Sequence, residues 1–159
     1  MFRKILVPVD PTGESRPAVD TAAELAGRLG ASLLLIEIVP TAHTTLGLAA
    51  DVAGGALTDP GVYGAEVAAR AQAAEGYLQA LAEELAGRGL DVAYTTGTGS
   101  AGAGIVEAAR REHVDLIVMA THARNPLGRL VFGSVTDHVM RHAHVPVLAI
   151  PPPAGPRDG

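Results

Sequence analysis

Four short runs of branched apolar residues, separated by stretches with helical spacing, constrain the fold of this 159-residue chain more than any other feature. They occupy residues 5–9, 32–39, 116–119 and 145–150, and a weaker run occupies 91–95. Almost every position in them is apolar, without the alternation of a half-exposed strand. Such runs are typical of strands buried on both faces. The sequence therefore predicts a parallel sheet with helices on both sides.

The stretches between the strands carry the apolar spacing of helices. Apolar residues recur at intervals of three and four in segments that start at Ala18, Val67, Ile105 and Val135. Pro17 suits only the first turn of a helix, so the first helix is expected to begin near Ser15. Strands that alternate with helices predict an α/β fold, a single doubly wound parallel sheet.

The length of the chain fits one domain, which we assign to residues 1–151. Residues 41–62 are rich in Gly, Ala and Thr and lack clear periodicity over most of their length, so a flexible loop is expected there. Residues 152–159 are expected to form a disordered tail.

The composition excludes several classes of protein. Seventeen acidic against twelve basic residues give a net charge of −5, which argues against a nucleic-acid partner. The chain has no cysteine, which removes disulfides, thiolate zinc sites and cysteine nucleophiles. No apolar run reaches the roughly 18–20 residues of a membrane span, and the N-terminus leads into a strand rather than a signal peptide. We therefore expect a cytoplasmic protein without a membrane partner.

Ligands of open α/β sheets bind beyond the carboxyl ends of the strands, so the residues after each strand are the candidates for a site. Asp10 follows the first strand and could bind a ribose hydroxyl or a phosphate-bound metal, or it could be a solvated turn residue. Gly133 and Ser134 precede the last helix, where free amides attract anions. Ser134 and Asp137 also have the spacing of a capping box.

Two further patterns point to other ligands, and each has a simpler interpretation. Residues 97–102 match the dinucleotide pattern GxGxxG, but the next strand does not end in the acid that would bind ribose, so a glycine-rich turn is favoured. His138, His142 and His144 could hold a metal, but they stand near the end of the last helix, where histidine complements the helix dipole. The chain contains no GxSxG or P-loop motif, and Lys4 is its only lysine, which argues against a phosphoacceptor receiver domain.

Four segments together, residues 4–10, 119–124, 130–135 and 141–148, resemble the universal stress protein family. The similarity extends from Lys4 to about Pro151. The resemblance implies a five-stranded sheet of order 3-2-1-4-5, like that of the adenine nucleotide alpha hydrolases. It also implies a homodimer that pairs through the last strand.

The resemblance to the nucleotide-binding members of this family implies a site for ATP, or for another adenine nucleotide, where the first and fourth strands meet. Pro8, Val9 and Asp10 would contact the adenosine, with Asp10 toward the ribose, and Ile38 would pack on the adenine. Mg²⁺ or Mn²⁺ could bind with the phosphates, and Asp10 is its candidate ligand. The residues implied to surround the phosphates are Met119, Ala120, Thr121, His122, Ala123, Arg124, Gly133, Ser134, Val135 and Thr136.

The chain departs from the family's ATP pattern, G-x-x-G, nine residues, then G-[ST]. Gly133 and Ser134 keep the end of the pattern, whereas Ala120 and Ala123 replace its two opening glycines. We expect a regulatory nucleotide-binding protein and assign no catalytic residue. The alternatives are a protein-interaction module without nucleotide and a slow ATPase or autophosphorylating switch, with Ser134 or Thr136 as acceptor.

Overall fold

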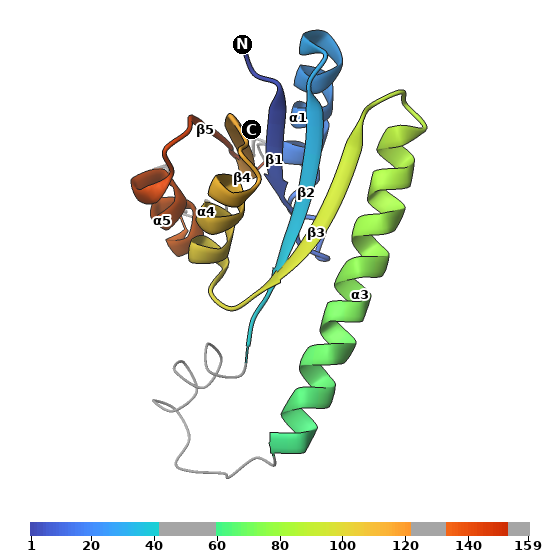
Figure 1. Cartoon of the computed structure of the whole chain (residues 1–159), viewed down its shortest axis with the longest axis vertical. Coiled ribbons are helices and arrows are strands. Elements are labelled where there is room, and N and C mark those ends of the chain that lie inside the picture. Colours follow the sequence, from blue (N-terminus) through green and yellow to red (C-terminus); the bar gives the residue numbers. More distant parts are fainter. Residues whose placement is uncertain (42–59, 122–132, 153–159) are drawn as a thin grey trace, which may run out of the picture.

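Five parallel strands form one sheet of order β3-β2-β1-β4-β5 in the computed structural model, which describes residues 1–41, 60–121 and 133–152 (Figure 1). The strands are β1 (Lys4–Pro8), β2 (Ser32–Val39), β3 (Val92–Thr98), β4 (Leu116–Ala120) and β5 (Val147–Ile150). The predicted fold class and strand order are confirmed. Most of the predicted 41–62 loop and of the 152–159 tail lies outside the described residues.

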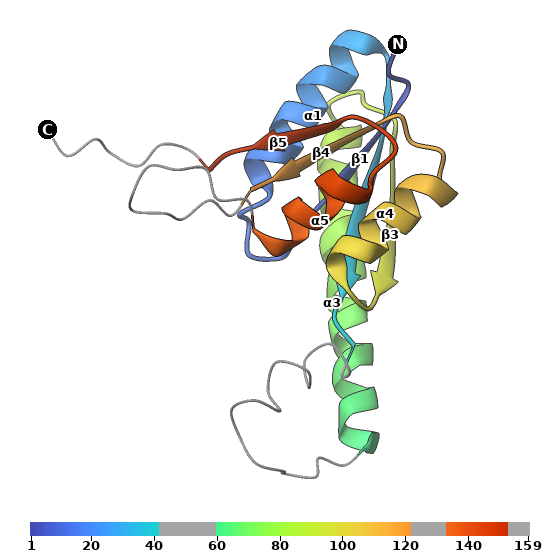
Figure 2. The same cartoon turned by 90° about the vertical axis from the view of Figure 1, so that its left-hand side faces the viewer.

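Helices cover both faces of the sheet. Helices α1 (Arg16–Leu29) and α3 (Pro60–Ala86) pack on one face, and α4 (Ala101–Arg111) and α5 (Ser134–His142) pack on the other (Figures 1 and 2). The first part of α3 projects past the end of the sheet in both views. No helix of the described ranges is both long and apolar enough to cross a membrane.

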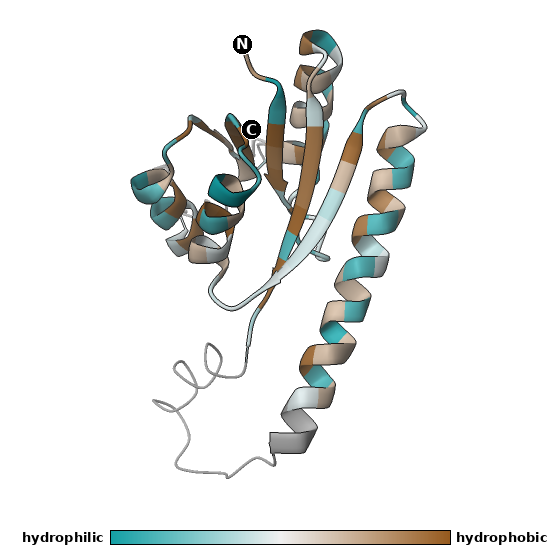
Figure 3. Cartoon of the chain, in the orientation of Figure 1, coloured by the Kyte–Doolittle hydropathy of each residue, from teal (hydrophilic) through white to brown (hydrophobic). Residues whose placement is uncertain are grey.

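Alternate residues of each central strand enter two separate cores, because successive side chains of a strand point to opposite faces. Leu33 and Leu35 pack toward α1 and α3, whereas Leu34 and Ile36 pack toward α4 and α5. The central residues of β1, β2 and β4 are apolar without interruption, and the central parts of β1 and β2 are brown in Figure 3. This double burial is the reason for the uninterrupted apolar runs in the sequence.

The sequence placed several helix and strand ends correctly. Helix α1 follows Ser15 and has Pro17 in its first turn, as predicted. It ends at Gly30, whose φ of 65° lies in the left-handed region that glycine adopts without strain. Strand β2 has the predicted bounds, and β3 continues beyond the predicted residue 95 to Thr98.

Two local predictions were wrong. Helix α3 begins at Pro60 rather than near Val67, so residues 60–62 are helical and not part of a loop. Proline is well suited to a first helical turn, and the Ala-rich stretch after it favours helix. The capping box is also absent: Gly133 is the N-cap of α5, and the Asp137 carboxylate accepts a hydrogen bond from Arg141 Nε at 2.8 Å.

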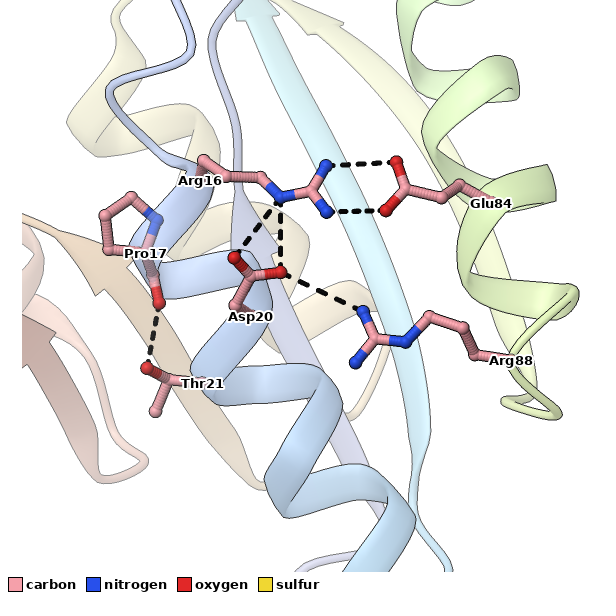
Figure 4. Close-up of polar contacts among 6 residues, drawn as sticks. All are labelled: Arg16, Pro17, Asp20, Thr21, Glu84 and Arg88. Carbon is pink, nitrogen blue, oxygen red and sulfur yellow. Dashed lines mark hydrogen bonds and ion pairs between the residues drawn. The ribbon is translucent and has the colours of Figure 1, made fainter.

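An ion-pair network on the surface joins α1 to α3. The Arg16 guanidinium donates two hydrogen bonds to the Glu84 carboxylate, at 3.0 and 2.5 Å, and a further one to Asp20 at 3.2 Å (Figure 4). Arg88 approaches Asp20 at 3.9 Å. The bond to Arg16 lowers the pKa of the Glu84 carboxyl. Because these side chains are about half exposed, the network is expected to contribute little to stability.

Candidate functional site

A cavity of about 560 Å³ opens beyond the carboxyl ends of β1, β2 and β4. In the sheet, β2 and β3 lie on one side of β1, and β4 and β5 lie on its other side. The cavity therefore lies where the strand order changes direction. This position and this size are typical of ligand sites in open α/β sheets. Its wall is mainly apolar and carries a small number of polar groups.

The structure places most of the described residues proposed from the sequence on the wall of this cavity. They come from four separate segments: Pro8, Val9, Asp10, Ile38, Met119, Ala120, Val135 and Thr136. Thr121, Gly133 and Ser134 are next to these residues in the chain but are not part of the lining. His122, Ala123 and Arg124 lie outside the described residues. A ligand at these positions stays a prediction.

The N-terminus of α5 forms one end of the site. Gly133 is extended, and the helix starts at Ser134, so the amides of the first three helical residues have no acceptor within the helix. Two of these residues, Val135 and Thr136, line the cavity. Thr121, which follows the lining residue Ala120 in the chain but is not itself part of the lining, is only 4% exposed, and its hydroxyl oxygen has no hydrogen-bond partner in the described part of the chain. This end of the cavity is suited to an anion.

Ile38 forms an apolar wall that depends on two glycines. A methyl group at Gly97 would lie 2.6 Å from Ile38 Cδ1, and one at Gly104 would lie 2.8 Å from the same atom. Both contacts are closer than carbon atoms can approach without a shift. The glycines of β3 and α4 therefore make room for the Ile38 side chain.

The glycines of the GxGxxG pattern thus have roles in packing and in the turn. Gly97 makes room for Ile38, and a methyl group at Gly102 would lie 2.9 Å from three carbon atoms of His138. Gly99 has a φ of 114°, a conformation that favours glycine. These observations support the glycine-rich turn over the dinucleotide interpretation.

Asp10 organises a turn, as one of its two interpretations predicted, and it also lines the cavity, where the binding of a ribose or a metal stays a prediction. Its carboxylate Oδ1 accepts hydrogen bonds from the Thr12 amide, at 2.9 Å, and from the Thr12 hydroxyl. Its own amide donates to Ser15 Oγ at 3.2 Å. The turn holds the carboxylate in place at the end of β1.

Glu37 is a residue of the cavity that the sequence analysis missed. It lies near the end of β2, and its Oε2 is buried without a hydrogen-bond partner among the described residues. Burial, with a smaller contribution from the negative charge of Asp10, raises the pKa of the Glu37 carboxyl. The signal was present in the sequence, because Glu37 is the one charged residue of the run 32–39.

The histidines of α5 do not gather into a metal site. The rings of His138 and His142 stack with their centroids 4.2 Å apart, and His142 Nδ1 donates to the His138 carbonyl at 2.8 Å. His144, which follows α5, instead accepts a hydrogen bond at its Nε2 from Arg110 Nε, at 3.4 Å. Over residues 1–41, 60–121 and 133–152, no three potential metal ligands cluster.

Comparisons with known proteins give one consistent result. The model of the universal stress protein family matches residues 1–151. Universal stress protein MJ0531 of Methanocaldococcus jannaschii is 28% identical over 153 residues, which cover 96% of this chain and 84% of that protein. The solved structure of MJ0577 from the same organism superposes with a TM-score of 0.75 at 21% identity, and it covers 98% of this chain and 99% of that one.

Two solved structures of similar fold hold adenine nucleotides. A universal stress protein from Archaeoglobus fulgidus in complex with dAMP superposes with a TM-score of 0.61 at 19% identity, and it covers 94% of this chain and 98% of that one. A universal stress protein in complex with cAMP superposes with a TM-score of 0.60 at 20% identity. The superposition covers 95% of this chain and 98% of that one. At these identities the likeness concerns the fold.

Proposed function

Because this chain belongs to the universal stress protein family, we propose that its cavity binds an adenine nucleotide, ATP, as a regulatory ligand. The observation that carries the proposal is the arrangement of the cavity wall. An apolar surface around Ile38 and the N-terminus of α5 belong to the same cavity, at the point where the strand order reverses. A nucleotide offers the matching parts, a flat apolar base and an anionic phosphate chain.

The two parts of the ligand have separate partners in this proposal. The adenine packs against Ile38 and Val9, and the ribose lies toward Asp10. The phosphates accept hydrogen bonds from the amides at the start of α5 and from the Thr136 hydroxyl. The solved relatives with cAMP and dAMP support an adenine nucleotide as the class of ligand.

Asp10 is also the proposed protein ligand of a divalent cation bound with the phosphates. Its carboxylate faces the cavity, and hard cations such as Mg²⁺ and Mn²⁺ prefer oxygen ligands. The cation would offset the repulsion between this carboxylate and the phosphate chain. We assign no turnover to the site, and the role is regulation in a cytoplasmic stress response.

The proposal predicts that ATP stabilises the protein against heat. At a concentration 100 times Kd, binding contributes about 2.7 kcal/mol, which raises the Tm of a domain of this size by roughly 5–10 °C. Differential scanning fluorimetry with ATP, AMP and no ligand measures this shift. The control is Asp10→Ala, for which a much smaller shift is expected. An unchanged Tm at millimolar ATP would contradict the proposal and favour the interaction module.

We further propose that two copies of the chain pair through β5. This strand is at the edge of the sheet, and Leu148 on β5 and Met140 on the adjacent α5 are 38% and 44% exposed. An exposed edge strand with apolar side chains is suited to pairing with a second copy. Multi-angle light scattering is expected to give the mass of two chains, and a monomer at micromolar concentration would refute this.

A further inference from the structure

Glu37 carries an inference that deepens the proposed nucleotide function and rests on it. We propose that Glu37 joins Asp10 in accepting hydrogen bonds from the two hydroxyls of a ribose, so that the cavity selects ribonucleotides over their deoxy analogues. Glu37 is then a residue that determines specificity and contacts the ligand directly.

The position of Glu37 in the sheet brings it to the same end of the cavity as Asp10. Strands β1 and β2 are neighbours in parallel register, with Pro8 opposite Ile36 and the Val9 amide bonded to the Ile36 carbonyl at 2.8 Å. Glu37 is one residue farther along β2, and Asp10 is two residues beyond Pro8. Both residues therefore lie toward the carboxyl ends of these two strands, and both line the cavity.

The carboxylate of Glu37 is poorly satisfied by the protein itself. Its Oε2 is buried and has no hydrogen-bond partner within the described ranges. A buried polar atom without a partner costs free energy, and a partner from a bound ligand, ion or water is one way in which that cost is offset. The rest of β2 is apolar from Leu33 to Ile36, so a hydrophobic residue could have occupied the position.

The chemistry of the ligand follows from two nearby acceptors. An ionised carboxylate only accepts hydrogen bonds, and the bonds from Thr12 use Asp10 Oδ1, so the pair can accept two further donors through Asp10 Oδ2 and Glu37 Oε2. A phosphate supplies none and would be repelled. The neighbouring 2′- and 3′-hydroxyls of a ribose are two uncharged donors at adjacent carbons, and they match the pair.

The other groups around Glu37 leave its charge uncompensated. Asp10, beyond β1, is a second negative charge. Burial raises the pKa of the Tyr77 hydroxyl of α3, and the nearby charges of Asp10 and Glu37 raise it further. Arg16 of α1 lies near Tyr77 but bonds Glu84 and Asp20. Arg70 of α3 lines the cavity, and its guanidinium pairs with Glu66 at 2.6 Å. A donor from the ligand is thus the natural partner of Glu37.

The pH dependence of binding has a defined sign. Burial raises the pKa of Glu37, and a hydroxyl that donates to the ionised form lowers it again on binding. Binding therefore releases a proton, and affinity rises with pH until Glu37 is ionised in the free protein. Phosphate groups of the ligand titrate as well. The contribution of Glu37 is therefore the difference between the pH dependence of the affinity in the wild type and in Glu37→Gln.

The test is a cycle of variants and ligands measured by isothermal titration calorimetry. Wild type, Glu37→Ala and Glu37→Gln are titrated with ATP, 2′-deoxy-ATP and 3′-deoxy-ATP, and Glu107→Gln on the exposed face of α4 is the matched control. We expect Glu37→Ala to lower the affinity for ATP about tenfold or more. The affinity for one deoxy analogue should stay nearly unchanged. Glu37→Gln should remove the proton release attributed to Glu37.

Other outcomes separate this inference from the proposed function. If Glu37→Ala lost the same affinity for ATP and for both deoxy analogues, or lost no affinity for ATP, the role of Glu37 would be overturned while nucleotide binding stands. Absence of any nucleotide binding by the wild type would overturn both.

A measurement without ligand tests the premise that the carboxylate is unsatisfied. The folded state raises the pKa of Glu37, so stability is lost as the pH rises through that value. Glu37→Gln lacks this charge and should melt at a higher temperature than the wild type at pH 7, with the difference shrinking toward pH 4. A difference that does not change with pH would overturn the premise.

Discussion

Replacing Leu78 with alanine is expected to lower the free energy of unfolding by about 2–5 kcal/mol, the range for truncation of a buried leucine. Leu78 is 0% exposed, at the centre of the face by which α3 packs on the sheet. Its neighbours on that face are Ala74, Leu81, Ala82 and Leu85. These side chains are packed between α3 and the sheet and cannot fill the space left by the missing atoms.

Urea denaturation followed by circular dichroism measures this loss. All variants are compared at equal protein concentration, because a dimer's stability depends on it. Gln79→Ala is the control: Gln79 is exposed, bonds only Glu83 of the same helix at 2.9 Å among the contacts of its side chain in the described structure, and should change stability by less than about 0.5 kcal/mol. A loss below about 1 kcal/mol in Leu78→Ala would mean that α3 is not anchored through this residue.

Replacing Ile38 with aspartate is expected to weaken ATP binding more than about 100-fold. The substitution removes an apolar surface worth about 2 kcal/mol. It also adds a third carboxylate to a cavity wall that already holds Asp10 and Glu37. The new charge would lie in the space that Gly97 and Gly104 leave for the isoleucine, where no basic group is nearby among the described residues that line the cavity except Arg70.

Equilibrium dialysis with labelled ATP measures this affinity, and circular dichroism verifies that the variant is folded. Ile38→Val keeps the apolar wall and is the matched control, with an expected loss of less than about fivefold. If Ile38→Asp folds and binds ATP as the wild type does, then the adenine does not pack on Ile38. The proposed orientation of the nucleotide would then be wrong.

The sequence predicted the elements that are buried on both faces more accurately than the exposed ones. Strand β2 was placed at its observed bounds, because its central residues, Leu33–Ile36, enter the two cores alternately and are all apolar. The start of α3 was missed by about two turns, because that part of the helix extends past the sheet and residues 64–66 are exposed. Apolar periodicity reflects burial, and exposed turns of a helix leave no such pattern.

For the site, the predicted residues on the cavity wall were found from their places after strand ends and from the family resemblance. Glu37 was missed because chemistry was sought after the strands and not within them. The capping role of Ser134 and Asp137 was wrong because the motif describes a spacing, while Arg141, one turn later, offers the carboxylate a charged partner.

The sequence by itself determined the parallel sheet, its covering helices and the segments that meet at its edge, since apolar periodicity and turn residues are local properties of the chain. Only the tertiary structure decided which groups share the cavity. It placed Glu37 near Asp10, and it showed that Gly97 and Gly104 yield their side-chain space to Ile38. These relations join residues far apart in the chain, and they depend on register and packing distances that no local pattern encodes.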